Sequence, residues 1–149
     1  MLTFGSVALG KPSAIKSSST YTPDKRTLSL LFDNAQCNDQ SDPDGRYMTT
    51  TFDVVFELHG EGSGTLQIDT RGALVEAGPS AFGLARLQVE GVTRIRLADE
   101  TSPNFYDRIK LTDCGPGKFA MSILLLANGG KEGGGALVSV DSVDLSLVS

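Results

Sequence analysis

Acidic and amide side chains are concentrated between Asp33 and Gly45, where Asp39, Asp42 and Asp44 are closely spaced. Calcium takes about six to eight oxygen ligands, and a loop of this composition approaches that number. The spacing is not that of an EF-hand, because no Glu closes the loop at its twelfth position. Two interpretations stay open: a calcium site at the three aspartates, or a solvated loop in which Asp and Gly shape turns. Calcium is the only cofactor that the sequence suggests.

Three arginines, Arg86, Arg94 and Arg96, follow one another in two neighbouring strand-like runs. If a three-residue bulged turn at Val89-Glu90-Gly91 joins these runs, the arginines lie on one outer face. The residues that would then face the core are Ala85, Leu87, Ile95 and Leu97. Such a row could bind a carboxylate or sulfate on a protein partner or a sugar. The alternative is cross-strand pairing with acidic neighbours, for which the candidates are Glu57, Glu76 and Glu90.

Catalysis has little support in the residue types. His59 is the only histidine, so a Ser-His-Asp triad would have to use it, and there is no Gly-x-Ser-x-Gly elbow. Alternation along Met48–His59 points His59 outward beside Glu57. A pair of carboxylates at glycosidase separation stays open, although the chain has no Trp and only three Tyr to line a sugar cleft. We therefore expect no enzyme, with a small hydrolase that uses His59 and carboxylates as an alternative.

Cys37 and Cys114 are far apart in the sequence, and both stand in polar, turn-like contexts. No CxxC pair exists and His59 is distant from both in sequence, which argues against a metal site. A disulfide between them would constrain the unfolded chain by about 4–5 kcal/mol. A disulfide and two separate thiols are both left open.

Strand-like runs separated by Gly, Pro, Asn and Asp fill the chain, and no amphipathic helix intervenes. The predicted strands are Thr3–Leu9, Ser18–Thr22, Thr27–Asp33, Met48–His59, Gly64–Asp69, Ala81–Val89, Thr93–Ala98, Phe105–Leu111, Lys118–Ala127 and Ala136–Val148. This pattern predicts an all-β fold, a single-domain antiparallel β-sandwich over residues 1–149, with jelly-roll or Ig-like topology undecided.

Two of these strands have unusual patterns. Lys118–Ala127 is apolar on both faces, since Leu124 and Leu126 alternate with the core positions, so it is either central or in contact with another protein. In the last strand the apolar residues change face. Val138 and Val140 lie on one face, whereas the valine and leucines after Asp141-Ser142 lie on the other. A bulge there would turn all of them inward. Equally, this strand could be an exposed edge that pairs with another subunit.

Charge and hydropathy limit the partners and the location. The formal charge of −5 and a sequence pI near 4.7 disfavour nucleic acid and anionic membranes. No apolar stretch of about 18 residues is present, so we expect no membrane span. The first residues also lack the basic and apolar regions of a signal peptide, which keeps a cytoplasmic location open.

Four segments agree in order with a known family. They are Thr22–Asp33, Asp69–Gly78, Asp113–Gly115 and Val138–Leu145. In this order they resemble the small secreted proteins catalogued as domain of unknown function four-three-six-zero. The family carries further cysteines where this chain has Ser17 and Tyr47, so its disulfide pattern does not transfer. The resemblance implies a secreted or cell-surface β-sandwich and supplies no catalytic residues.

We therefore expect a non-catalytic, acidic structural or protein-interaction module that is secreted or at the cell surface and is capable of forming an oligomer. Its partner would be protein, including a second copy of the chain, and the candidate contact residues are Arg86, Arg94, Arg96, Leu124 and Leu126. The first alternative is a calcium-dependent module for carbohydrate or another ligand.

Overall fold

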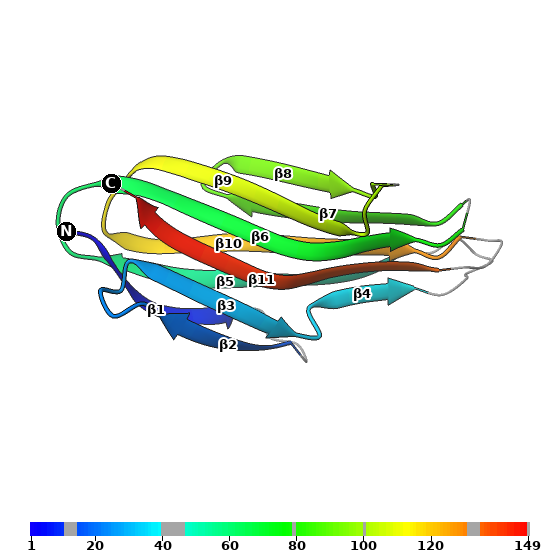
Figure 1. Ribbon diagram of the computed structural model, residues 1–149, viewed down its shortest axis with the longest axis horizontal. Coiled ribbons are helices and arrows are strands. Elements are labelled where there is room, and N and C mark those ends of the chain that lie inside the picture. The colour runs from blue at the N-terminus through cyan, green and yellow to red at the C-terminus, as the bar shows by residue number, and fades with distance from the viewer. Residues whose placement is uncertain (11–14, 40–46, 79, 100, 131–134, 149) are drawn as a thin grey trace.

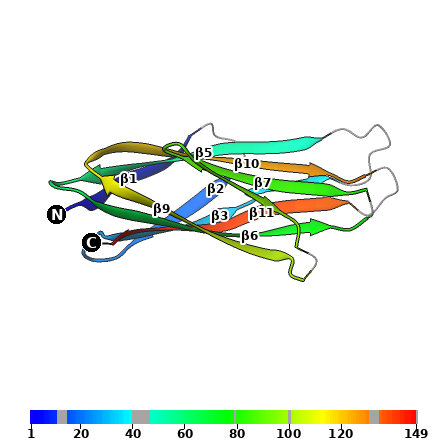
Figure 2. The same ribbon diagram turned by 90° about the horizontal axis from the view of Figure 1, so that it is seen from above.

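Two antiparallel sheets stacked face to face make up the structure (Figures 1 and 2). The computed structural model describes residues 1–10, 15–39, 47–78, 80–99, 101–130 and 135–148. Within these residues there are eleven strands and no helix, hence none that could cross a membrane. The strands are β1 (Thr3–Gly10), β2 (Lys16–Tyr21), β3 (Thr27–Asp33), β4 (Gln36–Asp39), β5 (Met48–His59), β6 (Gly64–Glu76), β7 (Phe82–Val89), β8 (Val92–Leu97), β9 (Asn104–Cys114), β10 (Gly117–Asn128) and β11 (Ala136–Val148). The predicted all-β sandwich is confirmed.

Neighbours in each sheet are mostly distant in sequence. Sheet A has the order β1-β5-β10-β7-β8, and sheet B has the order β2-β3-β11-β6-β9, with β4 also paired to β11. Sheet B lies in front of sheet A in Figure 1. Side chains alternate between the two faces of a strand, so every second residue enters the space between the sheets. Phe52, Val54, Phe56 and Leu58 of β5 do so, and each is at most 1% exposed.

The first and last strands are held together at one end of the sandwich by Arg26. Its guanidinium donates hydrogen bonds to the carbonyl oxygens of Leu2 (2.9 Å) and Leu147 (3.2 Å). Arg26 follows a tight turn in which the Thr22 hydroxyl donates to Asp24 Oδ1 at 2.6 Å. This turn, which precedes β3, therefore orients a side chain that joins the start of β1 to the end of β11.

The predicted change of phase in the last strand is confirmed. The pairing of β11 with β6 shifts register between Val140 and Ser142, which leaves Asp141 as the extra, exposed residue of a β-bulge. The apolar residues on both sides of the bulge are buried: Val138, Val140, Val143, Leu145 and Leu147. The strand is not an edge, because it lies between β3 and β6.

β10 is central in sheet A, as its two apolar faces predicted. It pairs with β5 on one side and β7 on the other. Met121, Ile123 and Leu125 face the core, while Leu124 and Leu126 lie on the outer face and are partly exposed.

The turn between β7 and β8 differs from the prediction. Val89 pairs directly with Val92, so the turn has two residues, Glu90 and Gly91, both with positive φ (46° and 80°). Two-residue turns of this kind match the twist of paired strands. One residue fewer in the turn moves every β8 side chain to the other face.

Replacing Glu90 tests this turn, because Asn adopts positive φ more readily than Glu. We expect Glu90→Asn to raise the free energy of unfolding by roughly 0.5–1 kcal/mol, measured by urea denaturation. Glu90→Gln removes the same charge without the conformational preference and should leave stability nearly unchanged. Equal effects of the two substitutions would contradict the turn assignment.

Candidate functional site

The described residues include the first part of the acidic loop. Asp42 and Asp44 lie outside the described residues, so the calcium site stays a prediction. Asp39 ends β4, and its Oδ2 accepts a hydrogen bond from the backbone N–H of Gly129 at 2.7 Å. In the described part of the chain no three His, Cys, Asp or Glu side chains gather as metal ligands. The described contact gives Asp39 a structural role at the start of the β10–β11 connection.

Of the two alternatives left open for Cys37 and Cys114, the structure has separate thiols rather than a disulfide, because both cysteines are free and buried. Cys37 on β4 pairs with Val138, near the beginning of β11. Cys114 pairs with Gly64, next to the pairing of Thr65 with Val148 at the end of β11. Ten residues of strand separate these positions, which corresponds to about 33 Å. Burial also raises the pKa of both thiols, which makes them poor nucleophiles.

Neither thiol should therefore react in the native state. We expect both cysteines to react with a thiol reagent only after denaturation, and a reductant to leave the melting temperature unchanged. When the protein is denatured and alkylated without a reductant, mass spectrometry should show two labelled thiols. An unlabelled protein with a mass lower by two hydrogens would contain a disulfide, which would contradict the separation of the two cysteines along β11.

His59 lies outward beside Glu57, as predicted. Its Nε2 is 2.9 Å from Glu57 Oε2, and this bond to His59 is the main reason that the pKa of Glu57 is lowered. Ser6 also hydrogen-bonds to Glu57, and Lys118 Nζ is 3.9 Å from its other oxygen. The carboxylate thus connects Ser6 to His59, whereas a triad requires the serine to contact the histidine. The contacts give no support to hydrolysis at His59.

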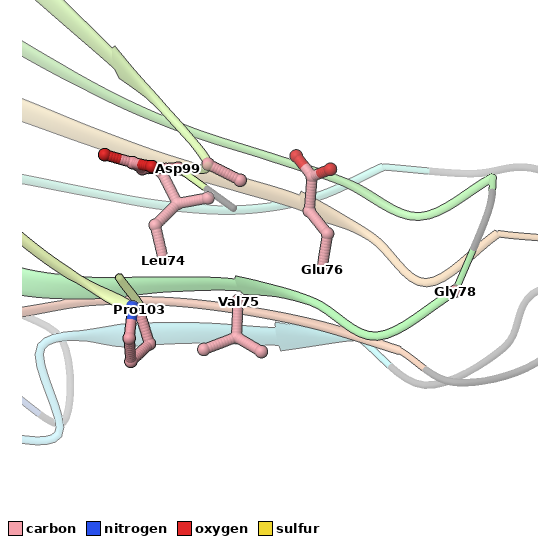
Figure 3. A pocket seen from close by; sticks show the side chains of 7 residues that line it. Leu74, Val75, Glu76, Gly78, Asp99 and Pro103 are labelled. Atoms are coloured by element: carbon pink, nitrogen blue, oxygen red, sulfur yellow. The ribbon is translucent and has the colours of Figure 1, made fainter. Parts of the chain in front are cut away.

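A pocket of about 450 Å³ lies where β6 ends, beside the connection from β8 to β9. Figure 3 shows Glu76 and Asp99 on the same side of β6 as Leu74. Both carboxylates already accept backbone hydrogen bonds, Glu76 from Gly83 and Asp99 from Thr101. The bond from the Thr101 hydroxyl chiefly lowers the pKa of Asp99. A glycosidase acid needs a raised pKa, so Asp99 is unsuited to that role.

The predicted arginine row does not form. Arg86 lies on the outer face, whereas Arg94 and Arg96 pair with Leu87 and Ala85, whose side chains face the core. The two-residue turn causes this reversal. Arg96 Nε donates to Asp107 Oδ1 on β9 at 3.0 Å, and Nη2 bonds the same oxygen. Arg96 therefore connects sheet A to sheet B.

Asp107 is a functional candidate that the sequence analysis missed. It is 2% exposed, and its Oδ2 and the hydroxyl of its cross-strand neighbour Thr70 are buried without a hydrogen-bond partner in the described residues. The alternation of residues along β9 could have identified it. Asp107 has the same parity as Ile109 and Leu111, which predicts an inward-facing carboxylate that needs a counter-ion.

The same reversal in β8 creates an apolar surface on the outer face of sheet A. Ile95 and Leu97 are each 56% exposed, contrary to the prediction that they face the core. Leu97 pairs with Leu84, and Leu84 pairs with Leu126. We call this surface the apolar patch; its members are Phe82, Leu84, Ile95, Leu97, Leu124 and Leu126. Arg86 lies within it, between Ile95 and Leu124.

The outer face of sheet B is polar and closely bonded. Tyr106 and Arg108 of β9 both donate to Asp69 Oδ1 of β6 at 2.8 Å. Arg71 Nη1 donates to Asp144 Oδ2 of β11 at 3.0 Å. The Arg71 guanidinium carbon also lies 5.0 Å from the centre of the Tyr106 ring, a cation–π distance. Three adjacent strands thus fix the position of one aromatic ring.

A shallow depression of about 390 Å³ lies beside this ring. It is lined by Arg71, Gly72, Asn104, Phe105, Tyr106 and Asp141. Asp141 is the bulged residue of β11, and bulges redirect side chains. The sequence analysis did not find this site, because its members come from three strands that are far apart along the chain.

Asp69 is the centre of the polar face, and its charge should contribute to stability. Burial opposes its ionisation, but hydrogen bonds from Arg108, Tyr106 and Gln67 outweigh burial and lower its pKa. In the window between this lowered pKa and the ordinary value near 3.9, the unfolded state binds more protons than the native state. Stability from Asp69 is therefore fully present above about pH 4 and is lost as pH falls through the native pKa.

Asp69→Asn should accordingly be less stable than the wild type at pH 7. We also expect the variant to lose less free energy of unfolding than the wild type as pH falls below 4. Urea denaturation at pH 7, 4 and 3 measures both differences. Parallel pH profiles of the two proteins would contradict the assignment of a lowered pKa to Asp69.

Comparisons with known proteins give no family. No family model matches the chain, and no curated protein does. A structure of infectious bursal disease virus Gt strain has a TM-score of 0.44 and 14% identity over 80% of this chain, which spans 32% of the viral chain. TmCBM61, solved with beta-1,4-galactotriose, has a TM-score of 0.37 and 10% identity, covering 91% of this chain and 90% of its own. The CBM22-1 xylan-binding domain from Paenibacillus barcinonensis Xyn10C has a TM-score of 0.33 and 10% identity, covering 96% and 86%. All three TM-scores lie below 0.5, so these likenesses carry no argument about function.

Proposed function

We propose that this protein is a non-catalytic interaction module that associates with a second copy of itself through the apolar patch. The observation that carries the proposal is the exposure of Ile95 and Leu97 in line with Leu84 and Leu126 across three neighbouring strands. Contiguous exposed apolar surface of this kind is typical of protein interfaces.

Association through the apolar patch would remove apolar area from water. Fully burying a Leu or Ile side chain stabilises by roughly 1.5–3 kcal/mol. Ile95 and Leu97 are about half exposed, so each would contribute about 1 kcal/mol if a partner covered it. The six apolar side chains of the patch, two of them about half exposed, surround one arginine. This resembles the centre of an interface, where Arg is enriched and other charges are depleted.

Contact through the face is favoured over pairing through the edge of the sheet. β8 is an edge strand, so its outer backbone groups could pair with another strand. Arg94 and Arg96 have inward parity on this strand, and inward-pointing charges are a common protection against edge pairing. The outer face has no comparable protection at the apolar patch.

A second copy suits this face because the face carries charges of both signs. Arg86 lies inside the apolar patch, while Asp53 lies farther along the same face on β5. A two-fold axis makes each copy use the same surface, so the arginine of one copy can meet the acidic part of the other. This arrangement explains a single positive charge within an otherwise apolar surface.

The test is light scattering behind size-exclusion chromatography over a range of protein concentrations. We expect a dimer, and we expect Ile95→Glu to raise the dissociation constant at least tenfold by placing a carboxylate in the apolar patch. Thr93→Glu is the control, because Thr93 lies on the same face of β8 outside the patch.

A monomer at every concentration, or equal weakening by the two variants, would contradict self-association through this surface. Repeating the measurement with calcium and with a chelator addresses the calcium-dependent alternative, which involves Asp39, Asp42 and Asp44. We also propose a secreted or cell-surface location, on the basis of the family resemblance described above.

A further inference from the structure

We propose that the depression beside Tyr106 binds a neutral saccharide, independently of calcium. This site lies on sheet B, opposite to the apolar patch, and goes beyond the proposed self-association. Its polar side chains, Arg71, Asn104 and Asp141, surround one exposed aromatic ring. Sugars present adjacent hydroxyl groups, each both donor and acceptor, together with apolar C–H faces, and this lining matches that chemistry.

The aromatic side chain is exposed yet fixed. Tyr106 is 43% exposed, while its hydroxyl donates to Asp69 and its ring lies near two guanidinium groups, 5.0 Å from Arg71 and 5.8 Å from Arg108. A ring held before the ligand arrives loses little conformational entropy on binding.

The depression exists because of two features of the backbone. The bulge in β11 adds Asp141 to the lining. Gly72 forms part of the floor: a Cβ atom there would lie 2.0 Å from the carbonyl oxygen of Ser139 and 2.7 Å from the ring of Phe105. Any side chain at position 72 would therefore displace the strand or the ring, so glycine keeps the floor in place.

The polar groups supply both donors and acceptors. Arg71 uses one nitrogen for Asp144, which leaves its other N–H groups for a ligand. Asp141 accepts a hydrogen bond from Ser139 at 3.3 Å through Oδ1, so its second oxygen can accept from a hydroxyl. Asn104 offers both a donor and an acceptor.

Charge balance favours a neutral ligand over an anion or a cation. The positive groups on this part of the face are Arg71, Arg108 and Lys110, and the negative groups are Asp69, Asp141 and Asp144. Two of the arginines already bind carboxylates. A phosphate or sulfate bound at Arg71 would lie close to the carboxylates of Asp141 and Asp144, which would repel it, whereas a neutral hydroxyl group can be added to the existing network.

One ring and three polar side chains predict weak binding, with a dissociation constant on the order of millimolar. The probes are neutral oligosaccharides of hexoses and pentoses, titrated one at a time into the full-length 15N-labelled chain, with chelator present. We expect at least one of them to shift the amide signals of Gly72, Asn104 and Tyr106.

Three variants locate the site. Tyr106→Ala should weaken the binding at least tenfold, and Asn104→Ala, which removes an exposed side chain outside the Asp69 network, should also weaken it. Tyr47→Ala is the matched control, because Tyr47 is exposed elsewhere and should have no effect. Ile95→Glu should bind the saccharide normally, which separates this proposal from self-association.

The proposal is overturned if none of the oligosaccharides moves these amides at concentrations well above millimolar, or if binding survives both Tyr106→Ala and Asn104→Ala. It is also overturned if inorganic phosphate or sulfate produces the shifts instead, because the site would then be an anion site. A requirement for calcium would locate sugar binding at the acidic loop rather than here.

Discussion

The bulge at Asp141 is the constraint on which the packing of sheet B against the core depends. β11 lies in the middle of sheet B, and strict alternation would turn either its first valines or its last leucines toward solvent. One extra residue restores inward parity on both sides. The same residue then has an exposed side chain beside Arg71 and Tyr106. A packing requirement thus provides a polar group for the outer face.

The two-residue turn at Glu90-Gly91 also sets the parity of a strand, but on sheet A it places apolar residues at the surface. The two-residue turn moves Arg96 toward the core and Ile95 to the surface. A buried carboxylate such as Asp107 is costly without a counter-ion, and Arg96 supplies one from the other sheet. Since the arginine is needed inside, the apolar residues of β8 must face outward. The apolar patch and the ion pair are therefore two results of one turn.

The sequence predicts strands better than it predicts connections. Long alternating segments such as Thr27–Asp33, Met48–His59 and Ala136–Val148 have the predicted bounds, because hydrophobic alternation depends on local parity alone. Strand β4 was missed, since only Ala35 and Cys37 mark its buried face within an acidic segment. The length of the β7–β8 turn was also wrong, because Glu-Gly fits both two- and three-residue loops, and one residue decides which face the arginines occupy.

The depression beside Tyr106 was beyond sequence reasoning for a different reason. Its lining joins β6, β9 and β11, whose adjacency is a property of sheet order rather than of any local pattern. The composition even argued against a sugar site, because the chain has no Trp and few Tyr. Composition counts aromatic residues, whereas binding depends on whether one ring is exposed, oriented and surrounded by hydrogen-bonding groups. Because the core uses one face of every strand, the outer faces are free to carry such specificity. These are apolar at one end of sheet A and bonded into a polar network on sheet B.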